Sequence, residues 1–194
     1  PTDTDMLLVP DPKSLRKVPW AREPTAQIIA DCYKASGEPH PLASRNVLKN
    51  ILSLYQQAGL RAEVAPEVEF YLVHKNTDPD YELMPPKGRS GRREVARMSF
   101  SIDAVAEFED FVEDMYDFAD EQALSVDTLI HENGAAQLEI NFNHGDPLDM
   151  ADQVFVFKRT VRETAQKHGM YATFMAKPMQ KEPGSALHIH QSIL

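Results

Sequence analysis

The sequence predicts an α+β fold in which a mostly antiparallel sheet carries helices on one face. After a Gly/Pro/His linker at 37–41, apolar periodicity gives the order helix, strand, helix, strand, strand, helix, strand, strand. This order lacks the strict alternation of a doubly wound fold. Asn133-Gly134, between two strand-like runs, is a strong hairpin signal. With 194 residues, the chain can form one substantial core, or one domain and part of another.

Composition narrows the function classes. The net charge is −10 and no Lys/Arg-rich block offsets it, which argues against nucleic-acid partners. No apolar run approaches the length of a membrane span, and we expect no membrane association. The single cysteine, Cys32, allows no internal disulfide and fits a reducing cytoplasm.

The first 35 residues predict short strands and turns. Strand-like runs cover 5–10, 15–18 and 25–33, separated by Pro-containing turns. They offer few apolar residues for a core of their own. We therefore interpret them as the end of a small β domain whose beginning is absent, with the linker at 37–41 opening a second unit.

After the linker, local signals define the expected elements. Ser44 is a candidate N-cap for a helix that ends at Gly59, and Ser101 caps a helix spanning 102–122. Asp146-Pro147 starts a third helix, which ends at His168-Gly169. Residues 74–97 predict a long polar loop. The expected strands are 65–73, 124–131, 136–143, 170–176 and 185–193.

Two carboxylates interrupt the strand at 65–73. Alternation places Glu67 and Glu69 on one face, where like charges repel by roughly 1–4 kcal/mol near a surface. A divalent cation held by oxygen ligands is the simplest positive partner for them. The alternative is an edge strand with one solvated acidic face.

Other expected strands carry polar groups that are unusual for a core. They are His131-Glu132, Gln137 and Glu139, and the alternating set His188, His190 and Ser192. Each could instead be a polar outer face or a satisfied histidine. Together, four carboxylates and at least one imidazole suit Mg²⁺ or Mn²⁺ better than Zn²⁺. An open, carboxylate-rich site of this kind points to phosphoryl transfer from a nucleotide.

Four segments in order resemble the signatures of the glutamine synthetase family: 66–70, 132–139, 174–178 and 184–192. Residues 5–11 resemble the end of that family's N-terminal β-grasp domain. The resemblance implies that 1–36 are the remnant of this domain and that 37–194 are the N-terminal part of the catalytic domain. It also implies a fragment that lacks the start of the first domain and the C-terminal half of the second.

The resemblance also implies roles for individual residues. Glu67 and His188 would bind one metal ion, and Glu69, Glu132 and Glu139 the other. Gly184 and His188 would contact glutamate, and His190 and Ser192 would lie near ATP. The implied activity is an ATP-dependent carboxylate–amine ligase that forms a γ-glutamyl amide through γ-glutamyl phosphate, with ammonia or an amine as acceptor. The implied parent protein is a ring-forming homo-oligomer; the resemblance assigns no catalytic side chain within this chain.

Departures from the family pattern bear on the subtype. Ala135 and Ala136 stand in the turn between Glu132 and Gln137, and Ala186 replaces a frequent glycine. These features are more similar to the branch that contains γ-glutamyl-polyamine (putrescine) ligases. Because the family's phosphate-binding arginines are absent, we expect no turnover from this chain alone. A non-catalytic metal-binding relative and an acidic α+β domain with coincidental motifs are the alternatives, and convergence of the candidate ligands distinguishes the latter.

Overall fold

The computed structural model describes residues 5–95 and 97–194 and contains a five-stranded sheet. Its strands are β5 (Ala62–His74), β6 (Val126–His131), β7 (Gln137–Phe142), β8 (Met170–Thr173) and β9 (Leu187–Ile193). Every pairing in this sheet is antiparallel. β5 is the central strand. β7 pairs with the middle of β5 on one edge; on the other edge, β9 pairs with the first half of β5 and β8 with its end.

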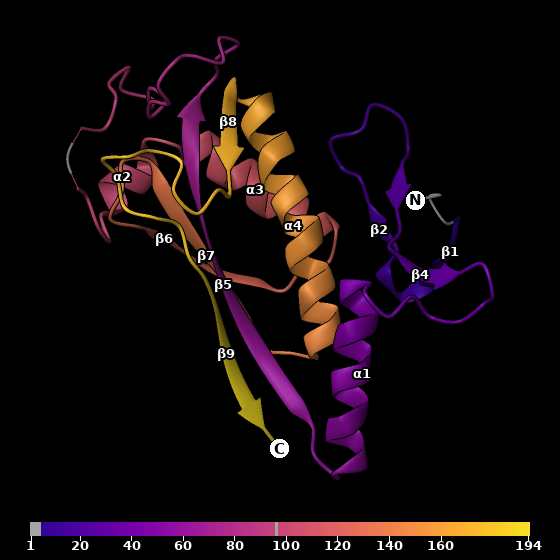
Figure 1. The fold of residues 1–194 in the computed structure, drawn as a ribbon. Coiled ribbons are helices and arrows are strands. Elements are labelled where there is room, and N and C mark those ends of the chain that lie inside the picture. Colours follow the sequence, from indigo (N-terminus) through magenta and orange to yellow (C-terminus); the bar gives the residue numbers. More distant parts are fainter. Residues whose placement is uncertain (1–4, 96) are drawn as a thin grey trace.

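Helices cover one face of this sheet, as the sequence predicts. The principal ones are α3 (Glu109–Glu121) and α4 (Pro147–Lys167), and they lie on the same side of the strands in Figure 1. Alternate side chains of β5 point into the core between the sheet and these helices; they are Val68, Phe70 and Leu72. The other face of β5 therefore remains for Glu67, Glu69 and Tyr71.

The N-terminal strands form two separate hairpin-like ladders beyond α1 (Ser44–Gln57) and α4 (Figure 1). β1 (Met6–Pro10) pairs with β4 (Ala30–Lys34), and β2 (Arg16–Lys17) pairs with β3 (Ala26–Gln27). The single strand expected over 25–33 is wrong. Ile29 breaks it, because its N–H donates to Ser14 Oγ of the turn η1 (Pro12–Ser14) and its carbonyl accepts the N–H of Asp11, the residue that caps η1.

The helix expected over 102–122 is two helices, α2 (Ile102–Ala106) and α3. Ser101 caps the first as predicted, accepting the N–H of Ala104. The break follows from Glu107, whose carbonyl accepts the N–H of Arg89 at 2.9 Å. In a continuous helix that carbonyl would accept the N–H of Phe111. The loop at 88–91 thus ends the helix, a contact that periodicity does not reveal.

Two smaller expectations are also corrected. Ser44 is the first helical residue of α1 and not its cap; Ala43 occupies the cap position without a side-chain bond. The β6–β7 hairpin forms as predicted, but neither residue of Asn133-Gly134 adopts a positive φ. Ala136 does so instead, at φ +56°. Its carbonyl accepts from Leu72 of β5, which fixes the turn by a tertiary contact.

Three helix signals agree with the structure. Gly59 follows α1 at φ +74°, and Gly169 follows α4 at φ +70°. Asp146 caps α4 by accepting the N–H groups of Leu148 and Asp149. Among the described residues, no helix combines the length and the apolar character that a membrane crossing needs.

Candidate functional site

The candidate site lies on the face of β5 opposite the helices, where three strands bring polar side chains together. The register places Glu67 beside His188 of β9 and Asn141 of β7, and Glu69 beside Glu139 of β7. Antiparallel partners that face each other project from the same side of a sheet. The alternation expected from sequence thus places Glu67, Glu69 and Glu139 on one surface.

Glu67, Glu139 and His188 converge most closely. Each offers one ligand atom, and these atoms all lie within 4.8 Å of one another. Glu139 is only 7% exposed, and burial raises the pKa of its carboxyl, with further increases from the charges of Glu67, Glu132 and Glu69. Four carboxylates therefore share this region, and a cation would relieve their repulsion.

Two histidines hold the carboxylate of Glu67. Its Oε2 lies 3.2 Å from His188 Nδ1, and its Oε1 lies 2.9 Å from His190 Nε2. Both imidazoles are more than half exposed. Ser192 shares their face but pairs with Glu63, roughly 13 Å along the strand from His188. The structure therefore brings His190 to the cluster and leaves Ser192 outside it.

Glu69 is held differently, by donors from two segments. Its Oε2 accepts the side-chain amide of Gln137 at 2.9 Å and the N–H of Ala186 at 3.0 Å. The same amide nitrogen reaches the carbonyl of Gly184 at 3.0 Å. A Cβ at Gly184 would lie 2.8 Å from the carbonyl oxygen of Ala176, so the close turn of this loop requires glycine.

Glu132 lies at the start of the β6–β7 connection. Its Oε2 accepts from the backbone N–H and side-chain amide of Asn133, at 3.3 and 3.4 Å. Its charge raises the pKa of Glu139 and also that of the buried Tyr71 hydroxyl, for which burial is the larger cause. Glu132 therefore lies within electrostatic range of the cluster without belonging to its closest trio.

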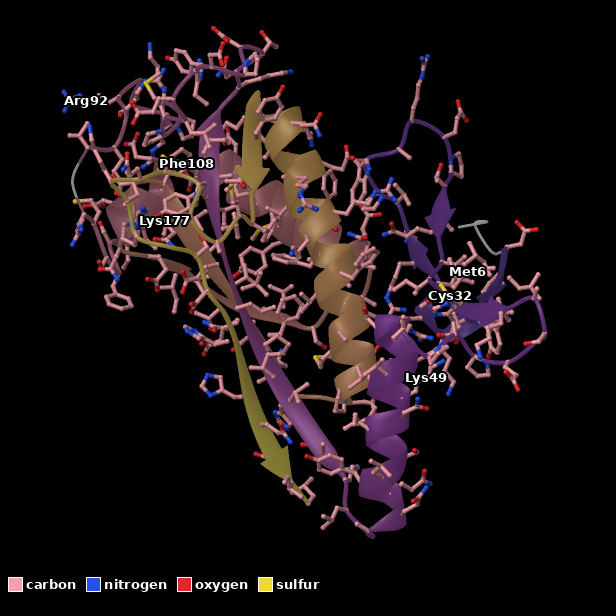
Figure 2. The ribbon with its side chains drawn as sticks, viewed as in Figure 1. Met6, Cys32, Lys49, Arg92, Phe108 and Lys177 are labelled. Atoms are coloured by element: carbon pink, nitrogen blue, oxygen red, sulfur yellow. The ribbon has the colours of Figure 1, made fainter. Side chains whose placement is uncertain are left out.

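The segment between β8 and β9 is fixed over the site by residues to which the sequence assigned no role. Tyr71, fully buried, donates its hydroxyl to the carbonyl of Pro183 at 2.8 Å. Lys177, labelled in Figure 2, donates to the carbonyl of Glu182. The sequence singles out Gln137 as a polar residue beside Glu139, but strand alternation does not reveal that its amide binds Glu69 and Gly184. Tyr71 reads as an ordinary core residue of an apolar strand.

The donor set fits a hard divalent cation. It consists of carboxylate oxygens and one imidazole nitrogen, without thiolate, which is the set that suits Mg²⁺ or Mn²⁺. One oxygen of Glu67, which pairs with His190, and one oxygen of Glu69, which pairs with Gln137, already accept hydrogen bonds, and this orients the carboxylates. Outer partners of this kind fix ligand geometry in metal sites.

Comparison with known sequences matches the family described as "Glutamine synthetase, catalytic domain" to residues 41–194. Glutamine synthetase of Pyrococcus horikoshii is 32% identical over 191 residues, 98% of this chain and 40% of that relative. Glutamate–isopropylamine ligase of a Pseudomonas species is 33% identical, covering 97% and 40%. Gamma-glutamylputrescine synthetase PuuA of Escherichia coli K12 is 36% identical over 180 residues, covering 90% and 38%.

A solved structure of a GmaS/ADP complex superposes on this fold with a TM-score of 0.84 at 28% identity. The match covers 100% of this chain and 43% of the other. The chain thus spans about 40% of the length of the curated relatives that it matches.

Proposed function

Since the chain belongs to the glutamine synthetase family, we propose that it forms part of the active site of an ATP-dependent ligase that joins an amine to the γ-carboxylate of glutamate. The observation that carries this proposal is the convergence of Glu67, Glu139 and His188 on one sheet face, beside Glu69 and Glu132. Coincidental motifs would have no reason to meet in this way.

Two divalent cations, Mg²⁺ or Mn²⁺, belong to the proposal. Glu67 and His188 would hold one, and Glu69, Glu132 and Glu139 the other. Because Glu139 lies close to Glu67 and His188, it would contribute near both ions. Bound here, the cations would neutralise charge that accumulates between ATP phosphates and a carboxylate substrate.

The chain's own residues would orient the reactants. Gln137 and Tyr71 fix the loop that carries Gly184, which together with His188 would bind glutamate, while His190 and Ser192 would face ATP. A γ-carboxylate oxygen of glutamate attacks the γ-phosphorus and ADP leaves, giving γ-glutamyl phosphate. The amine nitrogen then attacks the acyl carbon, phosphate leaves, and the nitrogen loses a proton. Holding the reactants in line is the main task of the protein in such a transfer.

The acceptor divides the proposal into two candidates. Ammonia would give glutamine, the product that the name of the Pyrococcus horikoshii relative implies. A larger amine would agree with the names of two other relatives, gamma-glutamylputrescine synthetase at 36% identity and glutamate–isopropylamine ligase at 33%. These values are similar to the 32% for glutamine synthetase, so the amine must be found by assay.

The deciding assay measures phosphate release from ATP and glutamate in a protein of the relatives' length. Ammonia, isopropylamine and putrescine are supplied separately, and Glu67→Ala and Glu69→Ala serve as matched variants. We expect one amine to stimulate release and each variant to abolish it. Metal uptake without release for any amine would instead indicate a non-catalytic relative. Residues 1–194 alone are expected to bind metal but not to turn over.

Three further parts of the proposal follow from the family resemblance. They are ring-forming homo-oligomerisation of a protein of that length, a cytoplasmic location, and a domain division into 1–36 and 37–194. Two features support the division: the family match begins at residue 41, and the N-terminal strands form their own ladders, separate from the main sheet.

A further inference from the structure

Glu94 lies in the long loop between β5 and α2 and reaches the connection between β6 and β7. Its Oε2 accepts the N–H of Ala136 at 2.8 Å and lies 3.0 Å from Nε2 of His131. The side chain is 13% exposed, and among the described residues its buried Oε1 has no hydrogen-bond partner. A carboxylate buried with half its acceptors unused costs free energy, so its position calls for an explanation.

His131 transmits the contact to the neighbouring backbone. Its side chain is fully buried at the end of β6, and its Nδ1 lies 2.8 Å from the carbonyl oxygen of Glu132. A carbonyl only accepts hydrogen bonds, so Nδ1 donates. The imidazole therefore connects the carboxylate of Glu94 to the backbone of Glu132.

The opposite end of the connection needs a similar restraint. Ala136 has φ +56°, a conformation that residues with a Cβ rarely adopt unless their surroundings impose it. The hydrogen bond from its N–H to Glu94 is one such restraint, and the bond from Leu72 to its carbonyl is another. Glu94 thus contacts the residue before the connection, His131, and the last residue within it, Ala136.

The connection joins two candidate metal ligands. Glu132 is its first residue, and Glu139 follows its last residue by three positions on β7. The conformation of 132–136 therefore sets the separation of these two carboxylates. We propose that Glu94 is a positioning residue that fixes Glu132 relative to Glu139 and thereby raises the affinity of the site for a divalent cation. This inference deepens the proposed function and rests on it for the role of the cation.

The first test is Mn²⁺ affinity, measured by electron paramagnetic resonance on the 194-residue chain. We expect Glu94→Gln, which keeps the size of the side chain, to weaken binding about 10- to 100-fold, the usual effect of losing an outer partner in a metal site. Glu82→Gln removes the same charge from an exposed position in the same loop and should change affinity less than about 2-fold. Equal affinities for Glu94→Gln and the parent chain would overturn the proposal.

A double-mutant cycle separates positioning from a general structural effect. If Glu94 acts through Glu132, the loss caused by Glu94→Gln should fall below about 3-fold when Glu132→Gln is already present. A loss of the same size in both backgrounds would overturn the proposal. Should Glu94→Gln fail to fold, Glu94→Asp provides the same comparison, because it retains the charge but is too short to contact both ends.

Amide hydrogen exchange keeps the geometry testable without metal. We expect faster exchange at Ala136 in Glu94→Gln than in the parent chain or Glu82→Gln, since the exchanging N–H loses its charged acceptor. Unchanged protection at Ala136 would overturn the positioning role even if Mn²⁺ binds. A parent chain that binds no Mn²⁺ would overturn the cation role in both proposals, whereas altered exchange would still support the contact of Glu94 with the connection.

Discussion

The side-chain amide of Gln137 joins the carboxylate of Glu69 to the carbonyl of Gly184, at 2.9 and 3.0 Å from one nitrogen. Gln137 begins β7, Glu69 lies in the middle of β5, and Gly184 belongs to the segment that precedes β9. One buried amide therefore links three segments that are distant in sequence. Its Oε1 also accepts the N–H of Gly134, so both ends of the amide are used.

Gln137→Ala should destabilise the fold by about 1–3 kcal/mol, because Glu69 and Gly134 each lose a buried partner. The measurement is the free energy of unfolding from urea denaturation. Gln166→Ala, at an exposed position of α4, is the matched control and should stay within about 0.5 kcal/mol. If both variants gave the same small change, the amide would not hold these segments together.

Glu139→Gln should stabilise the metal-free chain at pH 7. Burial and three neighbouring carboxylates raise the pKa of Glu139, so its ionised form opposes folding. Relief of about 1 kcal/mol would raise Tm by roughly 2–4 °C. A carboxyl with a raised pKa stabilises the fold below its unfolded pKa and loses this contribution as pH rises through the folded pKa. The gain should therefore vanish at pH 4 or below.

Added Mn²⁺ should make the Tm of the parent chain higher than that of Glu139→Gln. The parent chain gains stability in proportion to its metal affinity, whereas Glu139→Gln lacks a candidate ligand and should gain less. Glu113→Gln, an exposed charge on α3, is the control and should move Tm by less than about 1 °C with or without metal. Thermal unfolding followed by circular dichroism measures the Tm of the three chains with and without Mn²⁺. A lower metal-free Tm for Glu139→Gln would show that repulsion is not the dominant effect at this carboxylate.

Local patterns sufficed for the parts of the site that lie on single strands. Alternation along β5 and β9 placed Glu67 with Glu69, and His188 with His190, because side-chain direction in a strand depends only on parity. Gly59 and Gly169 marked the ends of two helices for an equally local reason: each adopts a positive φ, which glycine accommodates readily. The roles assigned to these site residues stay predictions.

Long-range contacts account for what sequence reasoning missed. The break before α3 arises from the bond between Arg89 and Glu107, and the unusual φ of Ala136 arises from Leu72 and Glu94. None of these partners is a neighbour in sequence, and Glu94 lies in a polar loop without periodicity. Tertiary contacts override local preferences at these positions.

Gly184→Ala should displace the loop before β9 and destabilise the fold by about 1–3 kcal/mol. The added Cβ would lie 2.8 Å from the carbonyl oxygen of Ala176, a backbone atom that cannot rotate away. Urea denaturation measures the loss, and proteolysis of the 177–186 segment reports the displacement. Lys181→Ala, at an exposed position of the same segment, is the control and should change stability by less than about 0.5 kcal/mol. A stable, protease-resistant Gly184→Ala chain would contradict the close packing.

The final prediction concerns Arg45 of α1, which connects the N-terminal strands to α4. Its guanidinium lies 2.6 Å from carboxylates of Asp11 and Asp31 and 2.9 Å from that of Asp152, and its side chain is 13% exposed. Arg45→Met would leave three carboxylates together. We expect a loss of about 3–5 kcal/mol in the free energy of unfolding at pH 7, measured by urea denaturation.

The pH dependence identifies charge as the cause. The hydrogen bond from Arg45 lowers the pKa of Asp11; at Asp31, burial opposes ionisation, but hydrogen bonds from Lys49 and Arg45 outweigh it and lower the pKa. A lowered carboxyl pKa contributes stability above the unfolded value, which is lost as pH falls through the folded value. The difference between Arg45→Met and the parent chain should therefore shrink below about pH 4. Arg61→Met removes an arginine that is 71% exposed and should cost less than about 0.5 kcal/mol. A loss for Arg45→Met that is as large at pH 3 as at pH 7 would assign the effect to packing of the side chain and not to its charge.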